Sequence, residues 1–224
     1  MKKIKFLVCC ILALNCNFIS NADSELDQLI EKLDSVMQAR GDYERSLENQ
    51  LINLKDLLKE QNTSTENKYF IINKIIEIYE YYSFEEALKY IEQNLKHAKT
   101  LNNSYFIEEC KLKLSKLLIS SGRYKESVDL LGGINKNSLN PKLLRNYYSA
   151  FTEAYSRLSF YTPVTESRKN YLELYTIYRD SLVKTLPRNS EEYLALVENQ
   201  QRDDGQIELA FKTNDKRLSM VKTD

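Results

Sequence analysis

Few residues of this sequence have the type and spacing that catalysis or metal binding requires. His97 is the only histidine, so the chain has no histidine-based metal cluster. The sequence has no glycine-rich phosphate loop, no serine elbow and no cysteine–histidine arrangement. Carboxylates are numerous, but no spacing marks two of them as a general acid and base. We therefore expect a non-catalytic protein without a cofactor or a metal ion.

The charge balance gives no sign of a nucleic-acid partner. The 224 residues carry 32 basic and 32 acidic side chains, and three of the basic ones (Lys2, Lys3 and Lys5) lie in an N-terminal segment that we expect to be removed. Without that segment the count is 32 − 3 = 29 basic against 32 acidic residues. No strongly basic surface is left, so we expect no direct nucleic-acid binding by this segment.

Residues 1–22 have the pattern of a secretory signal peptide, with a basic start, the apolar run 6–14 and a small-x-small site at 20–22. The apolar run is shorter than the roughly 20 residues that a membrane-spanning helix needs. We expect export, with a mature chain that begins at Asp23. A lipid anchor at Cys16 is the alternative, although Asn15 stands where lipoprotein signals have a small residue. After cleavage Cys110 is the only cysteine, so stability must come from packing.

Residues 114–131 predict two helices that meet at one glycine. Apolar residues recur at helical spacing on both sides of Gly122, so each helix has one face to bury against the other. Glycine adopts the left-handed conformation that reverses the chain after a helix at little cost. The composition agrees, because only 5 glycines and 3 prolines occur in a chain that is 42% hydrophobic.

This hairpin resembles the tetratricopeptide repeat (TPR), in which small and large residues alternate at fixed offsets. The matching positions are Leu114, Ser115, Leu118, Gly122, Tyr124, Ser127 and Leu131. Ser115 and Ser127 are small where the two helix backbones come closest. A similar small residue, Ala87, lies 127 − 87 = 40 residues earlier, after the capping residue Ser83.

The resemblance implies an all-α fold of antiparallel helical hairpins, stacked as a short TPR-like solenoid. We expect an N-terminal helical hairpin at 23–66 that turns near Gly41, and TPR-like repeats at 67–212. Residues 213–224 are expected to be a C-terminal helical extension, and its charged end at Asp224 indicates a fragment or a shortened family member.

The mature chain is similar to the periplasmic N-terminal region of membrane-bound transcriptional regulators of Gram-negative bacteria. In that family such a region precedes a transmembrane helix and a cytoplasmic DNA-binding domain. Neither follows here, so membrane attachment is expected only through a missing C-terminal helix or through Cys16. The resemblance implies a periplasmic module, or a membrane-anchored one that faces the periplasm.

Candidate binding residues follow from the TPR rule that the first helix of each hairpin lines the concave face. By position this rule selects polar and aromatic residues of two hairpins: Tyr69, Asn73, Tyr79, Glu109, Lys113 and Lys116. A polar side chain on a mostly apolar helix needs water or a partner. The lysines would pair the negative charge of an extended peptide or a carboxylate-bearing ligand, although an ordinary solvated helix face would have the same pattern.

Two functions remain open at this point. The first is a protein-interaction or ligand-sensing module of a signalling or transcription regulator, which takes a peptide, a protein or a small ligand in its concave face. The second is an exported glycan-binding or structural accessory protein that uses some of its 16 tyrosines as stacking surfaces. The sequence does not indicate the ligand or the oligomeric state.

Overall fold

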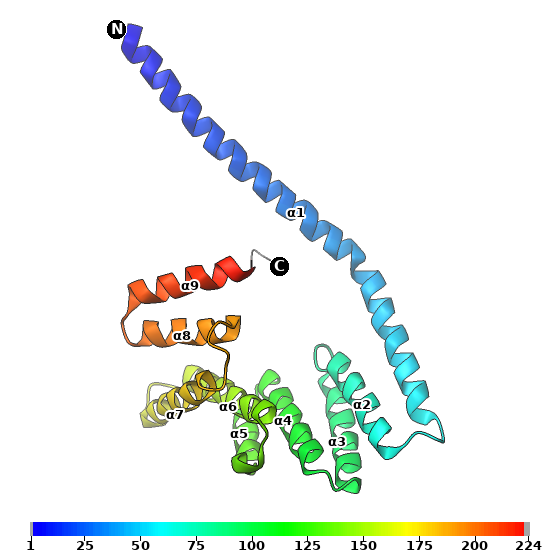
Figure 1. Ribbon diagram of the computed structural model, residues 1–224. Coiled ribbons are helices and arrows are strands. Elements are labelled where there is room, and N and C mark those ends of the chain that lie inside the picture. Colours follow the sequence, from blue (N-terminus) through cyan, green and yellow to red (C-terminus); the bar gives the residue numbers. More distant parts are fainter. Residues whose placement is uncertain (1, 222–224) are drawn as a thin grey trace. The chain divides into compact units, whose positions relative to one another are not determined.

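The structure is a computed structural model that describes the backbone of residues 2–221 and the side chains of residues 26–220. It contains two compact units, residues 1–53 and residues 54–224. Within the described residues all regular structure is helical (Figure 1). The helices are α1 (Lys2–Lys59), α2 (Thr65–Tyr79), α3 (Phe84–Thr100), α4 (Ser104–Ser120), α5 (Tyr124–Gly132), η1 (Lys136–Ser138), α6 (Pro141–Tyr161), α7 (Glu166–Val183), α8 (Glu191–Asp203) and α9 (Ile207–Val221). The expected all-α class is confirmed.

Helix α1 corrects the expectation of an N-terminal hairpin at 23–66. The helix runs without a break through Gly41 and ends at Lys59. A single glycine costs a helix only about 1 kcal/mol, and no proline adds to that cost. One side-chain pair also spans the position, since Arg40 Nε donates to Glu44 Oε1 at 2.7 Å, and Arg45 Nε donates to the carbonyl oxygen of Gly41 at 3.3 Å. The signal peptide at 1–22, with Cys16, and Asp23 lie outside the residues whose side chains are described.

Local capping signals set the helix ends in the second unit. Ser83 accepts a hydrogen bond from the backbone N–H of Glu86 at 3.4 Å and begins α3. Asn140 accepts one from the N–H of Leu143 at 2.9 Å, and Pro141 occupies the first turn of α6. The predicted cap at Ser83 is therefore confirmed, and the same kind of cap begins α6.

The α4–α5 hairpin has the geometry that its sequence predicts. Gly122 turns the chain with φ of 81°, in the left-handed region. Ser115 and Ser127 are fully buried, and Ser127 Oγ donates to the carbonyl oxygen of Ser115 at 3.0 Å. This short hydrogen bond confirms that the two helices approach closely at the small residues.

Replacing Ser127 tests this close approach. Ser127→Phe should lower the free energy of unfolding by about 1–3 kcal/mol or more, because the buried site has no room for a ring. Ser127→Ala should lower it by only about 0.5–1.5 kcal/mol, because it removes one hydrogen bond and leaves the packing intact. Denaturant titration measures both values. Equal stability of the two variants would contradict the close approach.

Consecutive helices of the second unit pack on one another from α2 to α7, and α4 also contacts α6 (Figure 1). The largest core cluster lies among α4, α5, α6 and α7. Its aromatic members stack, as Phe151 and Tyr178 do with ring centroids 4.2 Å apart. The fully buried or nearly buried members are Leu112, Ile119, Leu131, Ile134, Leu143, Tyr147, Ala150, Phe151, Ala154, Tyr155 and Leu158. Tyr171, Tyr175 and Tyr178 of α7 pack against this cluster as partly buried side chains.

The last hairpin, α8 and α9, turns at Gly205 with φ of 75°. The buried Arg179 of α7 connects it to the preceding helices, since Arg179 Nη1 donates to Asp203 Oδ2 at 2.6 Å. Helix α9 continues to Val221, so the expected repeat border at residue 212 lies inside a helix.

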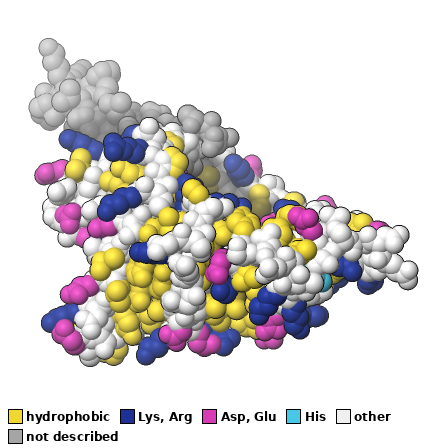
Figure 2. All heavy atoms as spheres, turned by 60° about the horizontal axis from the view of Figure 1, so that its bottom comes forward, with side chains coloured by type: hydrophobic (Ala, Val, Ile, Leu, Met, Phe, Trp, Pro, Cys, Tyr) yellow, Lys and Arg dark blue, Asp and Glu magenta, His cyan; other side chains and the backbone are white. Residues whose placement is uncertain are grey.

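The surface carries both signs of charge. On the face in Figure 2, lysine and arginine side chains alternate with aspartate and glutamate around an apolar area. This mixture agrees with the balanced composition of the sequence, and no single-sign field covers this face.

Candidate functional site

A polar network joins α2 to α4 through the carboxylate of Glu109. Tyr69, which is fully buried, donates its hydroxyl to Glu109 Oε2 at 2.6 Å. Asn73 Nδ2 donates to the same oxygen at 3.4 Å, and the Tyr105 hydroxyl lies 3.5 Å from Oε1. Burial, and then the hydrogen bond to Glu109, raise the pKa of Tyr69 well above its usual value, so its hydroxyl remains a donor.

Asn73 extends this network to α3 and to Lys113. Its Oδ1 accepts hydrogen bonds from Lys113 Nζ and from Asn94 Nδ2, both at 3.0 Å. Asn94 is fully buried and stands where a TPR usually has a small residue. Its amide occupies that space and also connects α3 to α2. Asn94 Oδ1 has no hydrogen-bond partner among the described residues.

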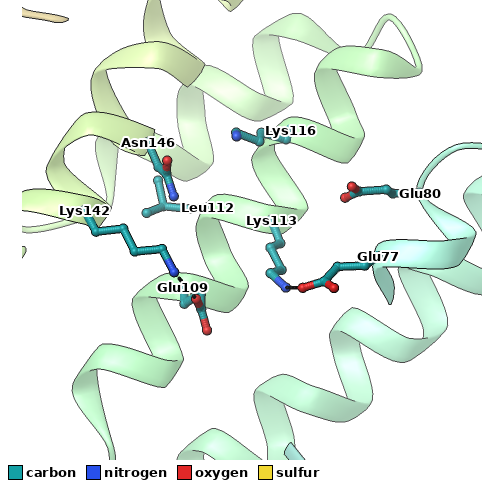
Figure 3. A pocket seen from close by; sticks show the side chains of 8 residues that line it. All are labelled: Glu77, Glu80, Glu109, Leu112, Lys113, Lys116, Lys142 and Asn146. Carbon is teal, nitrogen blue, oxygen red and sulfur yellow. Dashed lines mark ion pairs between the residues drawn. The ribbon is translucent and has the colours of Figure 1, made fainter. Parts of the chain in front are cut away.

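Side chains of α2 and α4 contact each other beside the network, and a pocket lies next to them. Tyr69 stacks on Phe106 with ring centroids 4.0 Å apart. The pocket, of ≈ 210 Å³, opens among α2, α4 and α6 (Figure 3). We call it the charged groove, and its lining residues are Glu77, Glu80, Glu109, Leu112, Lys113, Lys116, Lys142 and Asn146.

The charges of the groove are only partly paired. Lys113 Nζ lies 4.0 Å from Glu77 Oε1, and Lys142 Nζ lies 4.0 Å from Glu109 Oε1 (Figure 3). Lys116 is exposed and has no ion-pair partner among residues 26–220. An exposed ammonium next to the hydrogen-bonded side chains of the groove can pair with the carboxylate of a ligand without first breaking an internal ion pair.

An apolar pocket of ≈ 430 Å³ adjoins the charged groove and shares Glu77, Glu109 and Lys142 with it. Phe70 and Tyr105 are among its lining residues, and Phe70 is half exposed. The combined surface offers aromatic contact next to ammonium and carboxylate groups. This combination suits a peptide that has both apolar and charged side chains.

The structure brings together four of the six predicted binding residues. Glu109, Lys113 and Lys116 line the charged groove, and Asn73 lines the adjoining pocket. The expectation for Tyr69 and Tyr79 is wrong, because both side chains are buried and neither lines the charged groove or the adjoining pocket. The Tyr69 hydroxyl donates a hydrogen bond to Glu109, and the Tyr79 hydroxyl accepts one from Lys55 Nζ at 2.8 Å. A binding role for the other four residues stays a prediction.

Sequence reasoning missed the contribution of α6 and of the end of α2. Lys142 and Asn146 lie one turn apart at the start of α6, the first helix of the next hairpin. The rule that selected Lys113 and Lys116 would have selected them as well. Glu77 and Glu80 have no comparable signal, because the sequence gives them the pattern of a solvated helix face.

The described residues give little support for other chemistry. They contain no group of three or more histidine, cysteine or carboxylate side chains that could hold a metal ion. Burial raises the pKa of Cys110 to about 11, so its thiol stays protonated and weakly nucleophilic. Burial, and then Lys68, lower the pKa of His97. In the part of the chain with described side chains, no helix has the length and apolar character to cross a membrane.

These features define a TPR-type helical repeat protein, in which antiparallel hairpins stack and leave a polar groove between their first helices. Comparison with protein families supports this class and makes it specific. The SusR N-terminal TPR domain matches residues 37–224, and the chain belongs to this family. A search of the curated proteins found no match.

Membership relates the chain to SusR-type regulators and makes it a protein-interaction module. TPR-type helical repeat domains are generally non-catalytic and mediate protein interactions. The similarity to regulators that the sequence indicated is thus confirmed at the level of the family.

Proposed function

We propose that this chain is the periplasmic ligand-sensing module of a SusR-type regulator. It binds an extended peptide or another carboxylate-bearing ligand in the charged groove. A regulator needs a site whose occupation changes the packing of its helices, and this groove touches three helices at once. A ligand held by α2, α4 and α6 together favours one arrangement of the hairpins over others.

The single observation that carries this proposal is the state of the groove lysines. Lys116 is unpaired among the described residues, and Lys142 is 72% exposed and lies 4.0 Å from Glu109. The two ammonium groups are therefore accessible to an incoming carboxylate. Tyr69 and Asn73 donate hydrogen bonds to Glu109, so this side of the groove is ordered before a ligand binds.

Removing both accessible ammonium groups should weaken binding of acidic peptides. We expect Lys116→Ala with Lys142→Ala to raise the Kd for short extended acidic peptides roughly tenfold, since 1.4 kcal/mol corresponds to a factor of ten. Fluorescence titration of a panel of aspartate- and glutamate-containing peptides, each with an asparagine or glutamine counterpart, measures the effect. The thermal midpoint should not change, because both lysines lie at the surface.

The matched control replaces two lysines of similar exposure elsewhere, Lys89→Ala with Lys169→Ala, each of which pairs with a glutamate of its own helix. This control should bind like the wild type. If the wild type binds no acidic peptide of the panel, or if the groove variant and the control bind equally, the assignment of the groove is wrong.

We further propose that residues 1–22 direct export and are then removed. The basic start, the apolar run and the small-x-small site support this proposal. Residues 1–30 fused to a reporter that is active only outside the cytoplasm should give activity, and N-terminal sequencing of the exported protein should begin at Asp23. Retention of Met1 would contradict cleavage, and an acylated Cys16 at the N-terminus would establish the lipid anchor instead.

A further inference from the structure

After its internal pairing, the charged groove keeps one free charge of each sign. Three glutamates and three lysines line it, so these side chains add no net charge. Two of the lysines lie 4.0 Å from two of the glutamates. Lys116 and Glu80 are left, and neither charged group has an ion-pair or hydrogen-bond partner among residues 26–220. A balanced groove of this kind does not favour a ligand that carries negative charge alone.

Glu80 and Lys116 come from two different helices that border the groove. Glu80 directly follows the last residue of α2, and Lys116 lies on α4. Figure 3 shows the Glu80 carboxylate directed from the end of α2 toward α4. Both side chains are exposed, and they form no ion pair with each other. A ligand with a cation and an anion can therefore pair with both of them without breaking an internal contact.

The position of Glu80 is unfavourable for a carboxylate that has no cation beside it. The C-terminus of a helix carries partial negative charge, and the last turn of α2 contains no basic residue. Glu77, one turn earlier, pairs with Lys74 of its own helix at 2.7 Å. Among the described side chains, no lysine or arginine does the same for Glu80. An ammonium or guanidinium group of a ligand would supply this charge.

The size of the groove limits the part of a ligand that lies between the two charges. Its volume of ≈ 210 Å³ is below the roughly 300–1,000 Å³ of pockets that enclose a drug-sized molecule. The groove therefore takes a short stretch of a longer ligand. Leu112 offers apolar contact there, and the Asn146 amide can both donate to and accept from a peptide backbone.

We infer that the charged groove binds a dipolar peptide segment, in which a lysine or arginine side chain pairs with Glu80 and an aspartate or glutamate side chain pairs with Lys116. This inference rests on the function proposed above and defines its ligand more closely. An acidic peptide without a cationic side chain leaves Glu80 unpaired and binds less tightly.

Fluorescence anisotropy with labelled, terminally capped alanine peptides tests the inference. Each peptide contains one lysine and one glutamate, in either order, adjacent or separated by one or two alanines, and counterparts have glutamine in place of one charged residue. The tightest dipolar peptide should bind the wild type roughly two- to fivefold more tightly than its counterpart without lysine, the range of an accessible ion pair. Glu80→Gln should remove this difference and leave the affinity for the counterpart unchanged.

Glu66→Gln is the matched control, because Glu66 is an exposed carboxylate in the first turn of α2 and lines neither the charged groove nor the adjoining pocket. This control should keep the preference for the dipolar peptide. The inference is overturned if the wild type has no such preference, or if Glu80→Gln retains it.

A second comparison separates this inference from the function on which it rests. If Lys116→Ala with Lys142→Ala weakens binding of the dipolar peptide and of its glutamate-only counterpart while Glu80→Gln affects neither, the groove remains the ligand site and the dipolar ligand is wrong. If the wild type binds none of the peptides, both proposals are wrong.

Discussion

Leu131→Ala should lower the free energy of unfolding by about 2–5 kcal/mol, the usual cost of deleting a buried leucine side chain. Leu131 of α5 is fully buried in the core cluster that joins α4, α5, α6 and α7. Total stabilities of domains are about 5–15 kcal/mol, so this loss should be evident as a large shift of the denaturant midpoint. Because stacked repeats share one core, the transition should stay cooperative and move as a whole.

Leu172→Ala is the matched control for this substitution. Leu172 lies on α7 and is 45% exposed, so the same change of side chain should cost well under half as much. If the two variants have the same midpoint, Leu131 does not have the packing that the structure assigns to it.

Glu109→Ala should destabilise the protein by about 1.5–3 kcal/mol, because the substitution removes hydrogen bonds to a charged group and leaves buried donors without an acceptor. The affected donors are the fully buried Tyr69 hydroxyl and the Asn73 amide. Glu109→Gln keeps an acceptor oxygen and should recover part of the loss. Denaturant titration of the two variants gives both values.

Glu80→Ala controls for the loss of a carboxylate from the same groove. Glu80 is exposed, so its removal should change stability by no more than about 0.5 kcal/mol. A Glu109→Ala variant as stable as Glu80→Ala would show that the network adds nothing to stability, and Glu109 would then be a free groove residue.

The sequence predicted those parts of the fold that depend on local signals. The turn at Gly122 and the cap at Ser83 each depend on interactions within a few residues, and the structure confirms both. Gly41 shows the limit of such signals. A glycine permits a turn but does not require one, and the ion pair between Arg40 and Glu44 across Gly41 favours an uninterrupted helix.

The candidate site was less predictable because position on a helix does not determine burial. Helix α2 is apolar over most of its surface, so the sequence could not show which side faces a neighbour. In the structure the side chains of Tyr69 and Tyr79 are buried. The Tyr69 hydroxyl is hydrogen-bonded to Glu109 and the Tyr79 hydroxyl to Lys55. The hydrogen bond between Asn73 and Asn94 joins residues 21 positions apart. It depends on how α2 and α3 pack, which the sequence pattern of either helix alone does not show.

The most direct test of the groove as the ligand site is an NMR titration of the isotope-labelled chain with the tightest-binding acidic peptide of the panel. The account predicts that chemical-shift changes concentrate at Lys113, Lys116 and Asn146 and at their neighbours on α2, α4 and α6 (Figure 3). Changes confined to α7, α8 and α9, with these residues unaffected, would contradict it.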